Sequence, residues 1–247
     1  MELPKKSRLR ESLFSWRALR RHSVLILAAS ATGAVAALFR YLDDWSVQFS
    51  HWLATVSPWI QPAMLFFGMI LICQLRDRFF RGTDGTGIPQ AIAALKIEDG
   101  PARDHVLSWR ILVGKGLLLA IGLFAGMTIG REGPSVHAGA CFMYLSNRWG
   151  NFQGWLVQRG LILAGGAAGI AAAFNTPIAG AVFAVEEIGR SFEKENAGTI
   201  VRTVLVACIV CMALFGDYLF YGKLETRLDQ PLEWLVVPVL GVVFGLL

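Results

Sequence analysis

The sequence predicts an all-α, multi-spanning membrane protein, and three observations support that fold class. Hydrophobic residues make up 55% of the 247 residues and charged residues only 17%, with a mean hydropathy of +0.52. This balance is more apolar than a soluble domain normally carries. Several apolar runs are long enough, alone or with their neighbours, to cross a bilayer as helices of about 20 residues. The 26 glycines, many near alanines, suit the close helix packing of membrane proteins.

Residues 1–21 form a basic segment ahead of the first apolar run. Seven lysines and arginines stand there against Glu2 and Glu11. Leucines and a phenylalanine among them predict a cytoplasmic amphipathic helix over 1–21, followed by a partial transmembrane domain over 22–247. The positive-inside rule places this N-terminus in the cytoplasm. Nucleic-acid binding is the alternative use of a basic cluster, but a cluster directly before a span favours a topological role, so no nucleic-acid partner is expected.

The first two spans follow this segment. The first runs from about Ser23 to Phe39, long enough with its neighbours to be a span. A cleaved signal peptide is disfavoured because its apolar region, Val24 to Ala28, would be too short. The pattern leaves open a tilted extension through Leu53. The second span, about Ala63 to Leu75, returns the chain to the cytoplasm. Basic residues after it agree with the charge rule at the N-terminus: Arg76, Arg78 and Arg81.

A glycine-rich loop, GTDGTGIP over residues 82–89, leads into a short apolar helix from Gln90 to Leu95. Pro89 suits the first turn of that helix, and Thr86 supplies a hydroxyl. The GK[ST] sequence that completes a phosphate loop is missing, which disfavours nucleotide binding. A plain capped turn is the structural alternative. Residues 97–105 are expected to be a polar connection.

The sequence GREGP, residues 130–134, places a charged pair inside an apolar part of the chain. It follows an apolar run from Ile111 to Ile129 in which only Lys115 is charged. Pro134 suits the first turn of a new helix, which extends to about Trp149. Backbone broken at membrane depth is tolerated only where it lines a cavity or is buried in protein.

The amide groups at such a helix start attract an anion. The carboxylate of Glu132, at the same start, can occupy the anion position and leave it when protonated. The pattern therefore predicts a gate coupled to a proton. A solvated loop between two helices is the alternative for an Arg-Glu pair considered alone. His137, one turn into the helix, is expected to pack and hydrogen-bond.

Two further helices complete the predicted core. Residues 155–174 contain Gly165 and Gly169 at the spacing of tight helix pairs, so this helix must be pressed against others. Asn175-Thr176-Pro177 ends it and caps a short helix, 178–188, with Glu186 and Glu187 at its cytoplasmic end. Adjacent acids oppose the dipole at that end, so either one has a function or both are solvated end residues.

Residues 197–215 form another predicted span, and 232–247 begin one more. The chain stops inside that last run, so we expect a fragment of a longer protein. Cys208 and Cys211 have CxxC spacing but lie within a span without the context of a redox or metal motif. They are interpreted as packing residues, and neither a metal nor a cofactor is expected.

The ordered motifs GTGIP, GREGP and NTPIAGAVFAVEE resemble the CLC family of chloride channels and proton/chloride antiporters. Short Gly/Pro-interrupted helices that meet at mid-membrane are typical of ion transporters built as inverted repeats. The resemblance covers the whole chain and corresponds to roughly the N-terminal half of a family member. The implied fold is the first half of a CLC-type inverted repeat.

The resemblance implies a role for each motif residue. Glu132 matches the gating, proton-accepting glutamate, and Gly130, Arg131, Gly133 and Pro134 shape its helix start. The family's GSGIP anion loop matches Gly85, Thr86, Gly87, Ile88 and Pro89, with threonine where serine is usual. Glu187 matches the internal proton-transfer glutamate of the antiporters, which the family's channels usually lack. The family also implies a homodimer, with residues 178–188 and 198–215 in its interface.

The function expected is proton-coupled chloride exchange across a membrane, with a bacterial-type inner membrane as the expected location. The partners are then chloride, protons and lipid. A passive gated chloride channel is the alternative. A third possibility, an intramembrane hydrolase using Glu132 and His137, is disfavoured because HExxH, GxSxG and paired-Asp motifs are missing, so no enzyme is expected. A structural membrane subunit without transport is the fourth.

Overall fold

The computed structural model describes residues 16–152, 154–183, 186, 188, 194–216, 234 and 236–245. The chain divides into two units, Met1–Asp217 and Tyr218–Leu247, and each is described here by itself. Every regular element among the described residues is a helix, which confirms the predicted all-α class. Five helical stretches of the described residues are long and apolar enough to cross a membrane: Trp16–Val56, Ile60–Arg78, Gly100–Phe124, which contains two helices, Trp155–Phe174 and Ala197–Phe215.

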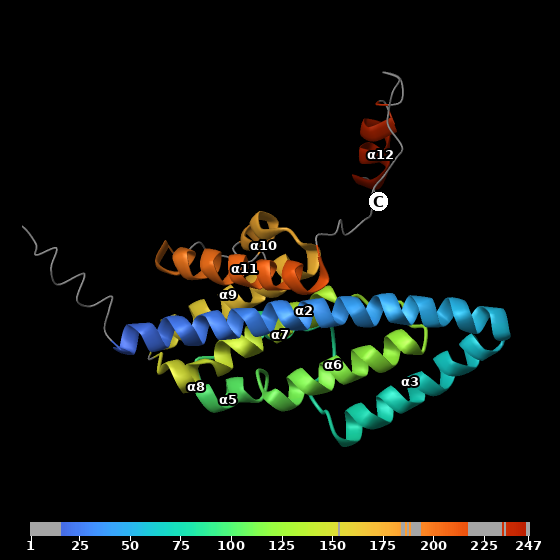
Figure 1. The fold of residues 1–247 in the computed structure, drawn as a ribbon, viewed down its shortest axis with the longest axis horizontal. Coiled ribbons are helices and arrows are strands. Elements are labelled where there is room, and N and C mark those ends of the chain that lie inside the picture. The colour runs from blue at the N-terminus through green and yellow to red at the C-terminus, as the bar shows by residue number, and fades with distance from the viewer. Residues whose placement is uncertain are drawn as a thin grey trace, which may run out of the picture. The chain divides into compact units, whose positions relative to one another are not determined.

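The longest helix, α2 (Trp16–Val56), is continuous over 41 residues (Figure 1). At about 1.5 Å per residue it is roughly 60 Å long, about twice the hydrocarbon thickness of a bilayer. The extension through Leu53 that the sequence left open is therefore helical. Its charged middle does not end it because Arg40 pairs with Asp44 at 3.2 Å, one turn on. After a short turn, α3 (Ile60–Arg78) runs back and packs mainly against the later helix formed by residues 109–124.

The next segment differs from expectation at one point. The glycine-rich loop leads into α4 (Ile88–Ala94), as predicted. The polar connection expected over 97–105 contains a short helix, α5 (Gly100–Asp104), which begins with Pro101 in its first turn. Proline at that position is already fixed in a helical φ, and the sequence interpretation overlooked this signal. The long apolar run then forms α6 (Trp109–Phe124), which Ser108 caps by accepting a hydrogen bond from the Ile111 amide.

The helix after GREGP begins two residues earlier than Pro134 and ends sooner than predicted. It is α7 (Glu132–Leu145), and a separate short turn, α8 (Asn147–Gly150), follows it. The helix α9 (Trp155–Phe174) has the bounds that the sequence predicts. It ends where Asn175 adopts a left-handed conformation. Then follow α10 (Pro177–Phe183) and α11 (Lys194–Phe215).

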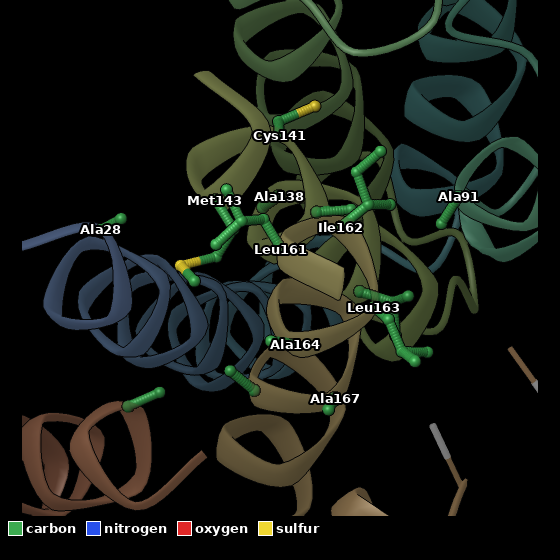
Figure 2. Close-up of a cluster of buried hydrophobic side chains, with 14 of the residues drawn as sticks. Ala28, Ala91, Ala138, Cys141, Met143, Leu161, Ile162, Leu163, Ala164 and Ala167 are labelled. Atoms are coloured by element: carbon green, nitrogen blue, oxygen red, sulfur yellow. The ribbon is translucent and has the colours of Figure 1, made fainter. Parts of the chain in front are cut away.

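The core of the first unit lies where α7 and α9 pack against each other, with α2 and α11 beside them (Figures 1 and 2). Its side chains are mostly small, such as Ala138, Ala164 and Ala167 in Figure 2. Gly165 allows the close approach because a Cβ there would lie 2.6 Å from the Gly139 carbonyl carbon. The tight packing predicted for the Gly165 to Gly169 spacing is thus confirmed. Cys208 and Cys211 are free and buried in this core, which agrees with a packing role.

The second unit contains α12 (Val236–Gly245), a ten-residue apolar helix. It falls inside the run over 232–247 in which the sequence predicts the start of a span. Residues 1–15 of the predicted N-terminal helix lie outside the described residues. Residues 16–21 are the first turns of α2.

Candidate functional site

The two motif loops meet at one cavity of about 600 Å³ in the first unit. From the glycine-rich loop it is lined by Gly85, Thr86 and Ile88, and from the GREGP segment by Gly130, Glu132, Gly133 and Pro134. These two groups are more than 40 residues apart in the chain. The fold therefore brings together seven of the residues that the sequence singled out.

The loops touch each other without intervening side chains. A Cβ on Gly133 would lie 2.6 Å from the Thr86 carbonyl oxygen, and one on Gly87 would lie 2.7 Å from the Gly133 carbonyl oxygen. Gly87 caps α4 at φ 115°, a left-handed conformation that glycine adopts without strain. The close contact fixes the start of α4 beside the start of α7.

The first turn of α7 lines the cavity and contains backbone amides that have no partner within the helix. The amides of Glu132 and Gly133 are too early in the helix to bond a carbonyl within it, and Pro134 has none. The amide and hydroxyl of Ser135 both donate to the Arg131 carbonyl, at 3.1 and 2.8 Å, which anchors this turn. An anion or a carboxylate in the cavity would therefore face a helix start of positive potential.

Glu132 is the acid at this helix start. Its side chain is partly buried and lines the cavity. It folds back over Gly130, where a Cβ would lie 2.6 Å from Glu132 Oε2. A larger residue at position 130 would thus displace the carboxylate.

Three of the predicted site residues do not line this cavity. Arg131 points away from it and is buried, and its Nη1 donates to Asp43 Oδ2 of α2 at 2.8 Å. Gly87 is buried in the contact between the loops, and Pro89 lies in the first turn of α4. Glu187 lies outside the described residues. Its neighbour Glu186 is exposed.

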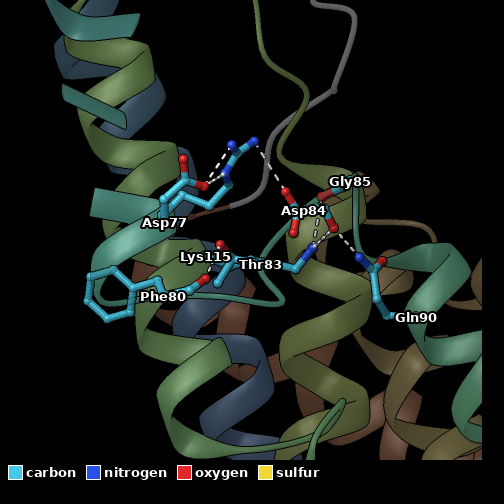
Figure 3. A network of polar contacts seen from close by, with 8 residues as sticks. Asp77, Phe80, Thr83, Asp84, Gly85, Gln90 and Lys115 are labelled. Atoms are coloured by element: carbon cyan, nitrogen blue, oxygen red, sulfur yellow. Dashed lines mark hydrogen bonds and ion pairs between the residues drawn. The ribbon is translucent and has the colours of Figure 1, made fainter. Parts of the chain in front are cut away.

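Lys115 is a cavity residue that the sequence interpretation did not include. It comes from α6, is 6% exposed, and donates from Nζ to the Gly85 carbonyl at 2.8 Å and more weakly to that of Asp84 at 3.4 Å (Figure 3). These carbonyls belong to the anion loop predicted from the sequence. Lys115 could have been predicted as a site residue, because it is the single charge in a long apolar run. Charged residues are costly in a membrane and usually functional.

A second set of polar side chains, apart from Lys115, contacts Asp84 of the same glycine-rich loop. Arg76, at the end of α3, pairs with Asp84 at 3.3 Å and with Asp77 at 2.8 Å. Gln90 of α4 donates from Nε2 to the Asp84 carbonyl (Figure 3). The loop is therefore tied to α3, α4 and α6. Arg76 was predicted only as a topological charge, because the sequence does not show that α3 ends beside the loop.

His137 is fully buried, and its Nε2 lies 3.1 Å from the Val106 carbonyl oxygen. This is the packing role expected for it. Among the described residues, no group of three or more His, Cys, Asp or Glu side chains is arranged to hold a metal ion.

Comparison with known proteins finds one family and several relatives. Residues 68–247 match the family described as voltage gated chloride channel. The chloride channel protein CLC-d of Arabidopsis thaliana is 31% identical over 216 residues, which cover 76% of this chain and 26% of that protein.

Two solved structures share the fold. A slow cyanobacterial Cl⁻/H⁺ antiporter superposes with a TM-score of 0.69 at 28% identity, over 92% of this chain and 54% of that one. A CLC-type fluoride/proton antiporter superposes with a TM-score of 0.67 at 23% identity, over 94% and 56%. The chain thus spans about half the length of these structures and about a quarter of the plant protein.

Proposed function

This chain belongs to the voltage gated chloride channel family, and from that premise we propose that it is the part of a proton-coupled chloride exchanger that holds the gate. The observation that supports this most directly is the single cavity shared by Thr86 and Glu132. A hydroxyl donor, a helix start and a titratable acid are together in it. The similarity to a Cl⁻/H⁺ antiporter also supports the proposal.

Chloride binds in this cavity through partial charges more than through a full countercharge. The candidate donors are the Thr86 hydroxyl and the first amides of α7, with the Lys115 ammonium nearby behind the loop. Lys115 adds positive potential while its protons are directed at carbonyl oxygens. Binding of this kind is favourable enough for entry and weak enough for release.

Glu132 acts as the gate and the proton acceptor. When ionised, its carboxylate competes with chloride for the same helix start, because both carry a single negative charge. When protonated, it loses that attraction and yields the position. Proton binding to Glu132 and chloride binding are then linked reciprocally, because each removes or replaces the carboxylate charge at the same helix start.

Glu187 carries protons between the cytoplasm and Glu132 in this proposal. It is inferred from the family pattern of the NTPIAGAVFAVEE segment, since it lies outside the described residues. Residues 1–21 are proposed as the cytoplasmic membrane-surface segment and 22–247 as the partial transmembrane domain. The location is an inner membrane with the N-terminus in the cytoplasm, and the assembly is a homodimer.

The test is chloride efflux from proteoliposomes with simultaneous recording of external pH, using the complete gene product. We expect a chloride gradient to drive protons uphill. Glu132→Gln should abolish proton movement, because an amide does not titrate, whereas Glu98→Gln, an exposed acid outside the cavity, should leave it unchanged.

Glu187 and its neighbour Glu186 provide a matched pair of variants that tests the proposed role of Glu187 in proton transfer. Glu187→Gln should abolish proton movement while chloride still flows, and Glu186→Gln should not. Chloride flux without proton movement in the wild type would identify a passive channel and refute the exchange proposal. Equal loss of proton movement in Glu186→Gln and Glu187→Gln would refute a specific role of Glu187 in proton transfer.

A further inference from the structure

The basic end of α2 borders an apolar groove that shares no lining residue with the motif cavity. The groove has a volume of about 440 Å³ and lies between residues 21–29 of α2 and residues 199–206 of α11. Its walls include Leu25, Ile26 and Ala29 from α2 and Leu205 and Val206 from α11. Ile26 is 53% exposed, so the groove is open to an apolar occupant.

A polar hollow of about 470 Å³ adjoins this groove. It is lined by Trp16, Arg17, Arg20 and Arg21 of α2 and by the turn after α8. Arg21 borders both the hollow and the groove. A single bound molecule could therefore place a negatively charged group in the basic hollow and an apolar group in the groove.

Arg21 and Arg202 lie near the junction of the groove and the hollow, and both keep N–H donors available for hydrogen bonds. Arg21 donates from Nη2 to the Asn151 carbonyl at 3.2 Å, with its guanidinium 5.7 Å from the Phe152 ring centroid. Arg202, across the groove on α11, donates from Nε to the Gly198 carbonyl at 2.9 Å. A guanidinium has five N–H donors, so most remain. Within the part of the chain that the structure describes, neither arginine takes part in an ion pair.

We infer that this junction binds one anionic phospholipid, with its phosphate between Arg21 and Arg202 and an acyl chain in the groove. Guanidinium groups match phosphate oxygens in charge and in geometry. Trp16, which lines the hollow and is 79% exposed, is of a residue type enriched at the level of lipid headgroups. The inference does not depend on chloride transport, because none of these residues lines the motif cavity.

The charge pattern favours a lipid over a protein occupant. A second copy of the chain, or a later segment of it, would have to place an acid at the arginines and an apolar side chain in the groove. An anionic phospholipid carries both groups and is present wherever the protein is inserted. If a protein segment fills the groove instead, the purified protein will show no preference for an anionic lipid.

The test is native mass spectrometry of the complete gene product with phosphatidylglycerol or phosphatidylcholine added. We expect phosphatidylglycerol to be retained preferentially. Replacing Arg21 and Arg202 together by Gln should weaken its retention about 30-fold, from the usual contribution of two basic residues at a membrane surface. Arg78→Gln, an exposed arginine at the end of α3 outside both spaces, is the matched control and should change little.

A second variant tests the apolar half without touching a charge. Ile26→Trp fills the groove from a half-exposed position and should also lower phosphatidylglycerol retention. Thermal unfolding without added lipid should match the wild type for each variant. Equal retention of both lipids by the wild type, an equal loss in Arg78→Gln, or full retention in Ile26→Trp would each overturn the inference.

Discussion

Arg131 is bound to Asp43 across 2.8 Å, and this ion pair joins the middle of α2 to the start of α7. The arginine side chain is only 5% exposed, whereas its neighbour Glu132 faces the cavity. The two charged residues of GREGP therefore have separate tasks. Arg131 anchors the helix start to α2, and the acid beside it stays available to the cavity.

Asp43→Asn should loosen the start of α7. The change leaves the Arg131 charge in a buried position without its carboxylate, which costs about 1–2 kcal/mol because Asp43 itself is about one-third exposed. We expect a lower unfolding temperature of the complete protein and slower chloride efflux.

Asp44→Asn is the matched control for this prediction. Asp44 is exposed to a similar extent and pairs with Arg40 at 3.2 Å, as Asp43 does more weakly at 4.0 Å, but the Asp44 pair stays within α2. It should lower stability by a few tenths of a kcal/mol, as exposed pairs do. An equal effect of both changes would show that Asp43 acts only within α2.

Lys115→Met should weaken chloride binding while keeping the volume and apolar contacts of the side chain. The change removes one positive charge and the hydrogen bond to Gly85. A charge in a partly desolvated site contributes roughly 1–2 kcal/mol to the binding of a nearby anion, so we expect about a tenfold rise in the chloride Kd. Isothermal titration calorimetry measures it directly.

The exposed Lys96 provides the comparison for Lys115. Lys96→Met should leave the chloride Kd within twofold, since a solvated charge outside the cavity is screened. An unchanged Kd in Lys115→Met would mean that the ammonium serves only to hold the loop. Loss of thermal stability without loss of affinity would support that role.

The sequence predicted the helices well where one signal governs each boundary. The bounds of α9 agree because Gly154 and Asn175 mark its two ends. The sequence left an outcome open where a partner distant in sequence contributes to it. Whether the first span extends through Leu53 was undecided, and the ion pairs from Arg40 to Asp44 and from Asp43 to Arg131 lie in the part of α2 that continues past Phe39.

In the candidate site, too, local features were predicted from the sequence, whereas contacts between distant residues were not. The motif residues were predicted individually, but the contact between Gly87 and Gly133 required the fold. Lys115 was visible as an isolated charge, yet nothing in the sequence indicates that its ammonium bonds to the Gly85 carbonyl. Arg131 was placed at the anion site because the family resemblance makes it one of the residues that shape the helix start, and its side chain points toward α2.

Gly133→Ala should separate the two helix starts. The added Cβ would lie 2.6 Å from the Thr86 carbonyl oxygen and 2.8 Å from the Thr86 Cβ, and the loop would have to move. Overpacking of this kind costs about 1–3 kcal/mol. We expect chloride binding to fall together with the unfolding temperature.

Gly100→Ala is the control for that steric effect. A Cβ at Gly100 would meet nothing within 4 Å, so the change should be within about 0.5 kcal/mol of neutral. If Gly133→Ala bound chloride as the wild type does, the close contact of the two loops would not be needed for the site.

Gly165→Ala tests whether the core of small residues positions the gate. The new Cβ would lie 2.6 Å from the Gly139 carbonyl carbon and 2.9 Å from the Ala140 amide nitrogen. These are backbone atoms, so α7 must shift as a whole, and Glu132 lies only about two turns away on the same helix. We expect a loss of about 1–3 kcal/mol in stability and slower exchange. Gly198→Ala on α11 meets only the flexible end of Arg202 at 3.4 Å and should be neutral or slightly stabilising, as alanine usually is in a helix. Normal exchange in a measurably destabilised Gly165→Ala protein would show that the gate tolerates movement of α7, and that the α7–α9 contact serves folding alone.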